Sequence, residues 1–369
     1  MYIACMISSL TKGGSERVMC NLMDYFVQQG HHVTLVTQYQ RTDEYPLNPK
    51  VNRILSQLTS EETGKSRMIN FKRRYFMLRN IWKKEKPDVV LSFIGKNNFM
   101  TILTAWGLHI PVVVSVRADP NLEYPNRWMR FTARHLFRKA AGVVLQTKEC
   151  FDFFPEAVKR KSVILHNPIN DTFFENFYDG EREHTIVTVG RMDENKNQAL
   201  LLKSFAQIAS DYPDYRVILY GKGELEEYLK NLAMKLGISD RVTFAGNVSD
   251  VAGAIRKAGI FVLTSNTEGM PNALIEAMIL GIPVIATDCS CGGPRDLIQH
   301  GVNGFLTPVG DVTKMKDNLQ KLFDCMQNQQ KMTEMRNAER KTTEIYKKEI
   351  ACREWMDYLI EKVKCCSQI

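Results

Sequence analysis

Short apolar segments of strand length alternate with helix-length segments along almost the entire chain, and this alternation limits the folds that the chain can adopt. In the first half the strand-like segments are YIACMIS, HVTLVTQ, DVVLSFIG, PVVVSV, GVVLQT and SVILHNP. In the second half they are TIVTVG, YRVILYG, RVTFAG, IFVLTS and PVIAT. Because strands separated by helical crossovers pair in parallel, the pattern predicts open, doubly wound α/β sheets.

The alternation is interrupted by a polar and aromatic stretch, INDTFFENFYDGEREH, that follows Pro168. A chain of 369 residues is long enough for two domains of ordinary size. We therefore expect an N-terminal Rossmann-like domain over residues 1–168, a linker over 169–183 and a C-terminal Rossmann-like domain over 184–346. A last helix is expected over 347–369, where Met356, Leu359 and Val363 form an apolar stripe.

The composition is that of a globular protein. Hydrophobic residues make up 44% and charged residues 24% of the chain, which allows sizeable cores. No window has the length and apolar character of a membrane span.

The nine cysteines lack zinc-ligand spacing, so we expect reduced thiols and no metal site. The first residues enter a strand without a basic leader, which favours the cytoplasm.

Positive charge is concentrated in the first half of the chain. Of 49 Lys and Arg, 25 lie in residues 1–170, against 13 of the 41 Asp and Glu. Two segments, 66–86 and RWMRFTARHLFRKA, mix cations with aromatic side chains. Such helices commonly bury an apolar face and solvate their cations. The competing interpretation is an anionic partner, namely a phospholipid surface, a lipid-linked diphosphate or a nucleic acid.

Two glutamates lie eight residues apart in the stretch TSNTEGMPNALIEAMILGIPVIATD. Glu268 precedes a helix expected to begin near Pro271 and Asn272, and Glu276 lies among apolar residues within it. A helix N-terminus favours phosphate, and a carboxylate that accepts two hydrogen bonds suits the vicinal hydroxyls of a ribose. This predicts a nucleotide sugar as ligand. The alternative is that Glu276 pairs with a Lys or Arg and Glu268 is solvated.

Cations and glycines gather at several predicted strand ends. Gly190 ends a strand, and Arg191 and Lys196 flank the turn that follows, where an Arg fork and a Lys point charge can bind a diphosphate. Glycine turns follow two other strands, at Gly13–Gly14 and at Gly221–Gly223, where a ligand can approach the backbone. A glycine pair alone is equally compatible with a plain turn, and the GxGxxG dinucleotide fingerprint is absent.

A further polar set follows the predicted strand PVVVSV. Ser115, Arg117 and Asp119 stand at its carboxyl end, where open α/β sheets gather their ligands. Arg is a permanent cation and no general base. We therefore expect Arg117 to contact a phosphate or an acceptor and not to transfer protons.

Several of these motifs resemble one known family. Glu268, Gly269, Pro271, Glu276 and Ala277 match in order the EGxPxxxxEA signature of family 4 glycosyltransferases, which are retaining enzymes of the GT-B fold. Other segments resemble further elements of that family, namely GGSE at 13–16, GRMDENK at 190–196, GKGE at 221–224 and CGGPRDLIQHGVNGFLTPVGD at 291–311. Two departures are Asp296 in place of the usual Glu and Arg117 near a position where many relatives carry His.

The resemblance implies two Rossmann-like domains that face a central cleft, with the last helix packed back on the first domain. It implies that Arg191 and Lys196 stabilise a leaving diphosphate, Glu268 contacts the transferred sugar and Glu276 holds the ribose. Other donor contacts would come from Gly13, Gly14, Gly190, Gly221, Gly223, Val248, Gly269, Met270, Pro271 and Asn272, with Arg117 and Asp119 on the acceptor side. No metal or other cofactor is expected, because the two cations can neutralise the diphosphate.

The implied reaction moves a hexose or N-acetylhexosamine from a nucleotide diphosphate sugar, with UDP the usual nucleotide, to an acceptor hydroxyl with retention of configuration. With the basic first half, it predicts a lipid-linked glycan acceptor and peripheral contact with the cytoplasmic face of an anionic membrane, as in bacterial polysaccharide assembly. The alternatives are a nucleotide-sugar epimerase or hydrolase, or a basic nucleic-acid-binding protein, although no nucleic acid partner is expected. An NAD dehydrogenase is disfavoured by the missing fingerprint.

Overall fold

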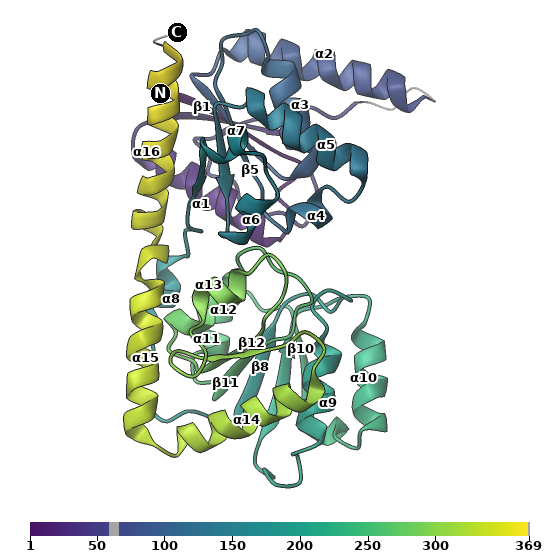
Figure 1. Cartoon of the computed structure of the whole chain (residues 1–369), viewed down its shortest axis with the longest axis vertical. Coiled ribbons are helices and arrows are strands. Elements are labelled where there is room, and N and C mark those ends of the chain that lie inside the picture. The colour runs from purple at the N-terminus through teal and green to yellow at the C-terminus, as the bar shows by residue number, and fades with distance from the viewer. Residues whose placement is uncertain (59–65, 368–369) are drawn as a thin grey trace. The chain divides into compact units, whose positions relative to one another are not determined.

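The computed structural model describes residues 1–58 and 66–367, and the chain divides into two compact units, each a parallel sheet covered by helices (Figure 1). The first unit comprises Met1–Pro168 with Lys348–Ile369, and the second comprises Ile169–Lys347. Within the described residues, no helix has both the length and the apolar character needed to cross a membrane.

The first sheet has the strand order β3-β2-β1-β4-β5-β6-β7, and all its pairs are parallel. Its strands β4, β5 and β6 are buried along their whole length, as parallel strands covered on both faces must be. The strand order reverses between β1 and β4. The strands are β1 (Tyr2–Ile7), β2 (His32–Thr37), β3 (Asn52–Leu55), β4 (Val89–Phe93), β5 (Val112–Ser115), β6 (Gly142–Leu145) and β7 (Ser162–Ile164).

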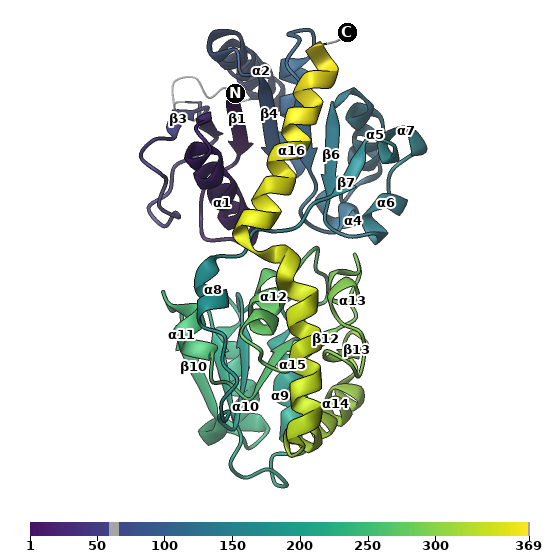
Figure 2. The ribbon, with the colours of Figure 1, turned by 90° about the vertical axis from the view of Figure 1, so that its left-hand side faces the viewer.

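The helices of the first unit are α1 (Gly14–Gln28), α2 (Arg67–Glu85), α3 (Gly95–Ala105), α4 (Pro120–Glu123), α5 (Arg127–Leu136), η1 (Phe137–Lys139), α6 (Glu149–Asp152), α7 (Glu156–Lys159) and α16 (Lys348–Ser367). The last of these packs beside α1 and in front of the sheet (Figure 2). Trp355 on α16 is fully buried, and its Nε1 donates to the carbonyl of His166 at 2.9 Å. Residues 368–369 of the expected last helix lie outside the described residues.

The second sheet has the order β10-β9-β8-β11-β12-β13 and is also parallel throughout. Its order reverses between β8 and β11, and ligands of open α/β sheets bind at such a switch point. The strands are β8 (Thr185–Val189), β9 (Arg216–Tyr220), β10 (Val242–Gly246), β11 (Ile260–Leu263), β12 (Val284–Thr287) and β13 (Phe305–Thr307).

The helices of the second unit are α8 (Asp171–Glu175), α9 (Gln198–Ala206), α10 (Glu226–Lys235), η2 (Ser239–Arg241), α11 (Val251–Ile255), α12 (Asn272–Ile279), α13 (Gly293–Leu297), α14 (Val312–Met326), α15 (Gln329–Thr343) and η3 (Glu344–Tyr346). The segment 169–183, expected as a linker, lies within this unit and carries α8. The reason is its apolar content, because Ile169 and Phe173 are buried in the cluster around α12.

Candidate active site

An ion pair joins the loops that follow β8 and β11, the two strands at the switch point of the second sheet. Lys196 Nζ lies 2.5 Å from Glu268 Oε1, and the two side chains keep 21% and 14% of their exposure. Both residues were predicted from the sequence to serve the donor, and the structure places them in direct contact. A pair this far withdrawn from water interacts more strongly than a surface pair.

Three buried hydroxyl groups support this ion pair. Thr264 Oγ1 donates to the carbonyl of Lys196 at 2.7 Å, and Ser265 Oγ donates to Glu268 Oε1 at 2.6 Å. Thr287 Oγ1 in turn donates to the carbonyl of Ser265 at 2.5 Å. None of the three was singled out from the sequence. The only available signal was that polar Thr264 and Ser265 directly follow the apolar strand IFVL.

Asn195 ties the same two loops together. Its Nδ2 donates to the carbonyl of Thr267 at 3.0 Å, and its Oδ1 accepts from the backbone N–H and the hydroxyl of Thr267 at 3.1 and 2.9 Å. The backbone N–H of Asn266 also donates to the carbonyl of Asn195 at 2.7 Å. The positions of Lys196 and Glu268 are therefore set by a continuous hydrogen-bonded frame.

Arg191 differs from Lys196 in its surroundings. Its side chain is 79% exposed, and its Nη2 lies 3.1 Å from Asp193 Oδ2. Asp193 also accepts from the backbone N–H of Lys196 at 2.9 Å, and the backbone carbonyl of Arg191 accepts from Gln198 Nε2 at 2.8 Å. The loop backbone is thus fixed, while the guanidinium extends into solvent and can meet an anionic ligand.

The predicted glycine turn after β9 packs directly on the loop after β8. Gly221 has φ +126°, and a Cβ built on it would lie 2.0 Å from the carbonyl oxygen of Gly190. A Cβ on Gly223 would lie 2.2 Å from the carbonyl oxygen of Met192. Neither position accepts a side chain without backbone movement. Gly190, Gly221 and Gly223 therefore shape the loop that carries Arg191.

Helix α12 begins at Asn272, after Pro271, as the sequence pattern predicted. Glu276 lies one turn further along and is 3% exposed. Gly269 packs on the start of α13, because a Cβ on Gly293 would lie 1.7 Å from its carbonyl oxygen. Met270 is half-buried, and its Sδ lies 3.5 Å from the hydroxyl of Tyr346. The predicted donor-side segment 268–276 is thus one tightly packed loop and helix start.

Cys289 lies beside the same carboxylate. Burial, and then the negative charge of Glu268, raise the pKa of the Cys289 thiol to about 12. The group is therefore a neutral thiol at physiological pH and a poor nucleophile.

In the first unit, the glycine turn after β1 leads into α1 through Gly13 as N-cap. The carboxylate of Glu16 folds over this turn, because a Cβ on Gly13 would lie 2.4 Å from Glu16 Oε2. A carboxylate in the first helical turn is stabilised by the helix dipole. An anionic ligand at this helix start would compete with Glu16.

Arg117, predicted on the acceptor side, is 8% exposed. Its guanidinium carbon lies 4.8 Å from the centre of the Phe93 ring, and Nη2 donates to Asn167 Oδ1 at 2.8 Å. The side-chain amide of Gln146 is oriented so that its nitrogen donates to the carbonyl of Arg117 at 3.1 Å. Its oxygen Oε1 then accepts from Arg117 Nη1 at 2.9 Å. Burial lowers the pKa of Arg117 to about 9, although nearby carboxylates raise it. The group remains a cation at neutral pH.

Asp119 and Glu123 organise the loop that follows Arg117. Asp119 caps α4 by accepting from the backbone N–H of Asn121 at 2.8 Å, which gives this predicted acceptor-side residue a structural partner. The carboxylate of Glu123, which sequence analysis missed, accepts from the backbone N–H groups of Gly95 and Arg117 at 2.6 and 3.0 Å. Burial raises the pKa of Glu123, and these hydrogen bonds oppose the shift.

Val248 lies in the loop between β10 and α11 and is half-buried. In the part of the chain that the structure describes, no group of three or more His, Cys, Asp or Glu side chains is arranged to hold a metal ion.

Comparison with known families and proteins shows the family to which the chain belongs. The model of the family described as Glycosyltransferase Family 4 matches residues 12–173, and that described as Glycosyl transferases group 1 matches residues 170–342. The chain belongs to the family 4 glycosyltransferases, and it is therefore a sugar-transferring enzyme.

Relatives of nearly the same length are known from bacteria. An uncharacterized glycosyltransferase of Haemophilus influenzae is 28% identical over 354 residues, which cover 94% of this chain and 96% of the relative. A Campylobacter jejuni relative is 27% identical over 326 residues, which cover 87% of this chain and 88% of the relative. Its name is GalNAc-α-(1→4)-GalNAc-α-(1→3)-diNAcBac-PP-undecaprenol α-1,4-N-acetyl-D-galactosaminyltransferase.

Solved structures share the fold. HepE from Anabaena, crystallised with UDP, superposes with a TM-score of 0.81 at 17% identity, covering 98% of this chain and 100% of HepE. A glycosyltransferase from Rickettsia africae has a TM-score of 0.81 at 16% identity and covers 98% of each chain. The predicted GT-B fold class is confirmed.

Proposed function

We propose that this glycosyltransferase moves a hexose or N-acetylhexosamine from a UDP-sugar to a hydroxyl group of a glycan acceptor, with retention of configuration. The observation that carries the proposal is the Lys196–Glu268 ion pair at the switch point of the second sheet. A cation and a carboxylate held side by side offer contacts for a phosphate and for a sugar hydroxyl within one small region. UDP and UDP-glucose are present in structures of HepE, which shares the fold.

In the proposed reaction, the bond between the anomeric carbon and the diphosphate oxygen breaks and the acceptor oxygen forms the new bond on the same face. The acceptor proton passes to an oxygen of the departing diphosphate. Arg191 and Lys196 stabilise the negative charge that develops on that leaving group, in place of a metal ion. Lys196 has three N–H donors, so it can bind a phosphate oxygen while it keeps its contact with Glu268. Glu276 binds the ribose hydroxyls.

The proposed acceptor is a lipid-linked glycan of polysaccharide assembly. The name of the Campylobacter jejuni relative includes a PP-undecaprenol-linked glycan. A second relative, AmsD of Erwinia amylovora, is named for amylovoran biosynthesis and is 24% identical over 78% of this chain. Both names agree with a glycan acceptor, and the first agrees with a lipid diphosphate carrier.

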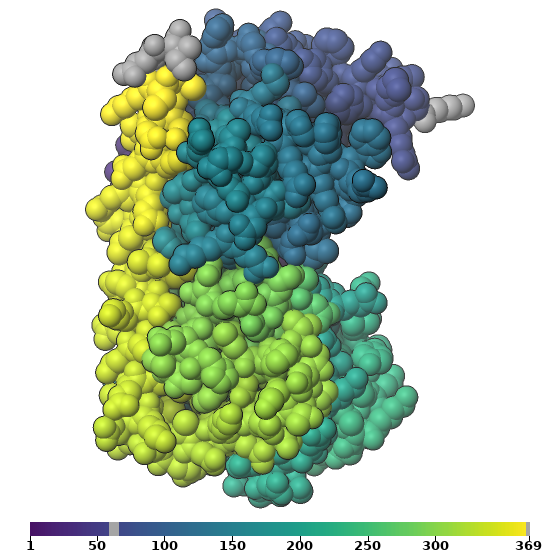
Figure 3. Space-filling model, viewed as in Figure 1, coloured from purple at the N-terminus to yellow at the C-terminus, as the bar shows by residue number. Residues whose placement is uncertain are grey.

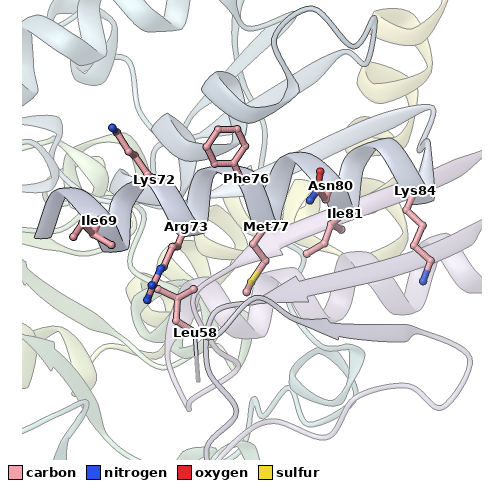
Figure 4. Close-up of a pocket in the computed structure, with 9 residues that line it drawn as sticks. All are labelled: Leu58, Ile69, Lys72, Arg73, Phe76, Met77, Asn80, Ile81 and Lys84. Atoms are coloured by element: carbon pink, nitrogen blue, oxygen red, sulfur yellow. The ribbon is translucent and has the colours of Figure 1, made fainter. Parts of the chain in front are cut away.

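We further propose that the first unit contacts an anionic membrane through α2. Side chains of α2 project from the surface of this unit (Figure 3), and Met68 and Phe76 are 69% and 60% exposed. A groove of about 810 Å³ runs along the helix. Figure 4 shows Arg73 and Met77 on the side of Leu58, whereas Lys72 and Phe76 point the other way. Apolar side chains mixed with cations suit a headgroup region.

The cations of α5 are less available for this role. Arg130 Nε donates to the carbonyl of Tyr124 at 3.1 Å, and Arg134 Nε donates to the carbonyl of Phe153 at 2.8 Å. These bonds hold both side chains against the first unit, whereas Lys72, Lys83 and Lys84 on α2 are exposed. We therefore propose α2, and not α5, as the cationic membrane contact.

The donor and the reaction are tested together. Thermal unfolding of the wild-type protein is recorded with a series of nucleotide sugars, because a ligand that binds only the folded state raises the melting temperature. A stabilising donor is then incubated with polyprenyl-diphosphate-linked glycans, and the product is analysed by mass spectrometry and by NMR of its anomeric proton. We expect stabilisation by UDP-sugars and an α-linked product from an α-configured donor. Donor hydrolysis or epimerisation without an acceptor would contradict the proposal.

Membrane contact is tested by liposome flotation. Lys72→Glu/Lys84→Glu on α2 is compared with Lys203→Glu/Lys235→Glu, which alters two lysines that line a surface groove of the second unit. We expect the α2 variant to lose binding to anionic vesicles and the control to retain it. Equal binding of the wild type to neutral and anionic vesicles, or tight salt-dependent binding to RNA instead, would contradict this part of the proposal.

A further inference from the structure

The two carboxylate oxygens of Glu268 have different surroundings. Oε1 accepts from Lys196 Nζ at 2.5 Å and from Ser265 Oγ at 2.6 Å. Among residues 1–58 and 66–367, no hydrogen bond reaches Oε2. This oxygen is not one of the buried polar atoms that lack a partner, so it is in contact with solvent. One oxygen is therefore used by the protein, and the other keeps lone pairs and solvent access for a ligand.

Ser265 fixes this division between the two oxygens. It directly follows Thr264 at the end of β11, and its side chain is fully buried, with 0% exposure. Its carbonyl accepts from Thr287 Oγ1 on β12, so its backbone is held by the neighbouring strand. A hydroxyl group this deeply buried cannot touch a bound substrate. Its hydroxyl proton is donated to a carboxylate, which is a stronger and more directional bond than one between neutral groups.

We propose that Ser265 is a positioning residue for the donor sugar: it holds Glu268 so that Oε1 stays with Lys196 and Oε2 accepts hydroxyl groups of the transferred hexose. This inference rests on the proposed function, and it adds which oxygen reads the sugar and which residue orients it. Without the Ser265 hydroxyl, Oε1 keeps only its contact with Lys196, and the plane of the carboxylate can turn about that contact so that the other oxygen no longer faces the sugar. The orientation that serves the sugar is then only one of several.

The consequence is specific to the sugar part of the donor. Ser265 acts through Glu268, and in this proposal Glu268 contacts the sugar and not the nucleotide. Loss of the hydroxyl therefore weakens binding of the UDP-sugar but not binding of UDP. A role of Ser265 in stability alone would affect both ligands equally, because both bind the same folded unit.

The test compares four proteins: the wild type, Ser265→Ala, Glu268→Gln and the double variant. Ser204→Ala is the matched control, since Ser204 is also fully buried in the second unit and its Oγ donates to the carbonyl of Leu200 at 2.8 Å, on α9. Dissociation constants for UDP and for the preferred UDP-sugar are measured by calorimetry, with initial transfer rates, and thermal unfolding confirms that each variant is folded.

We expect Ser265→Ala to bind the UDP-sugar about tenfold more weakly, as the loss of one hydrogen bond to a charged group predicts. UDP binding should stay within about twofold, and Ser204→Ala should match the wild type for both ligands. In the Glu268→Gln background, removing the Ser265 hydroxyl should add little. Equal losses for UDP and UDP-sugar, or an unchanged Ser265→Ala, would overturn the inference alone. A folded wild type that binds neither ligand would overturn the proposed function and this inference with it.

Discussion

Lys196 and Glu268, 72 residues apart in the sequence, form an ion pair whose atoms Nζ and Oε1 are 2.5 Å apart. The pair exists because the loops after β8 and β11 meet at the one place in the second sheet where the strand order reverses. Both groups are mostly withdrawn from water, so neither can be removed without leaving the other charge poorly compensated. Several expectations follow from this arrangement and its surroundings.

Lys196→Ala should lower kcat/KM by about 10²-fold or more, because it removes a cation from the developing diphosphate charge. It should also lower the free energy of unfolding, since Glu268 then lacks its cation. Combining it with Glu268→Gln should recover part of this stability and none of the activity. Urea titrations and initial rates of all three variants provide the measurement. Activity within twofold of the wild type would remove Lys196 from the proposed mechanism.

Arg191→Ala should separate activity from stability more cleanly. The side chain is 79% exposed and pairs with Asp193, and exposed ion pairs contribute about 0–1 kcal/mol. The melting temperature should therefore hardly change, while the affinity for UDP falls severalfold. Arg216→Ala, at an exposed position on β9, serves as the control. If both variants bound UDP like the wild type, the assigned diphosphate contact would be wrong.

Glu276→Gln keeps the shape of a nearly fully buried side chain and removes its charge. We expect the variant to fold and to lose transfer by orders of magnitude, because a neutral amide accepts the two ribose hydroxyls less well than a carboxylate. Affinity for UDP should fall with that for UDP-sugar, in contrast to Ser265→Ala. The exposed Glu334→Gln on α15 controls for the change in net charge. Full turnover by Glu276→Gln would contradict the ribose assignment.

Gly221→Ala should disturb the loop that carries Arg191. At φ +126° a side chain is strained, and its Cβ would lie 2.0 Å from the carbonyl oxygen of Gly190. We expect a loss of about 1–3 kcal/mol in the free energy of unfolding together with loss of donor binding. Gly237→Ala is the comparison, because Gly237 also has positive φ but its Cβ would meet nothing within 4 Å. Equal effects of both changes would show that only backbone strain matters.

Glu339 on α15 should make the stability of the protein depend on pH. Its side chain is fully buried, and neither carboxylate oxygen has a hydrogen-bond partner among the described residues. Burial raises its pKa well above the usual value, although the charges of Arg182 and Arg336 oppose this. The folded state then holds a proton that the unfolded state releases as the pH rises above about 4.3. Its contribution to stability is full below that pH and declines above it.

The corresponding variant is Glu339→Gln, which cannot ionise. Relative to the wild type, its free energy of unfolding should rise between pH 4 and pH 8, whatever constant offset the amide introduces. Chemical denaturation at four pH values measures this trend, with Glu334→Gln on the same helix as control. A difference between variant and wild type that does not change with pH would mean that Glu339 is ionised in the folded state.

The sequence predicted the fold class because parallel strands buried on both faces must be continuously apolar, as in VVLSF and VVVS. It did not reveal β3, because NRIL has little apolar character and Arg53 is instead held by Glu44 at 2.6 Å. It also did not reveal α8, whose aromatic residues are buried by α12 and not by their sequence neighbours. Both elements depend on partners distant in the chain.

For the candidate site, the sequence pattern indicated residues whose chemistry is unusual in its local context, such as Glu276 in an apolar helix. It could not indicate Ser265 or Glu123. A serine after a strand is common, and its importance depends on a carboxylate that only the folded loop brings to 2.6 Å. Likewise, Glu123 matters through backbone N–H groups from two other segments of the first unit.

Helix α16 is the last element of the chain, yet it completes the hydrophobic core of the first unit, where Trp355 and Leu359 are fully buried. On the ribosome, residues 1–168 therefore emerge long before the helix that covers them. The second unit, which is continuous in sequence, can reach its native state earlier. Newly made chains consequently expose the apolar surface around β1 and β4 until α16 has been synthesised, and in this interval a chaperone would bind the N-terminal part of the chain.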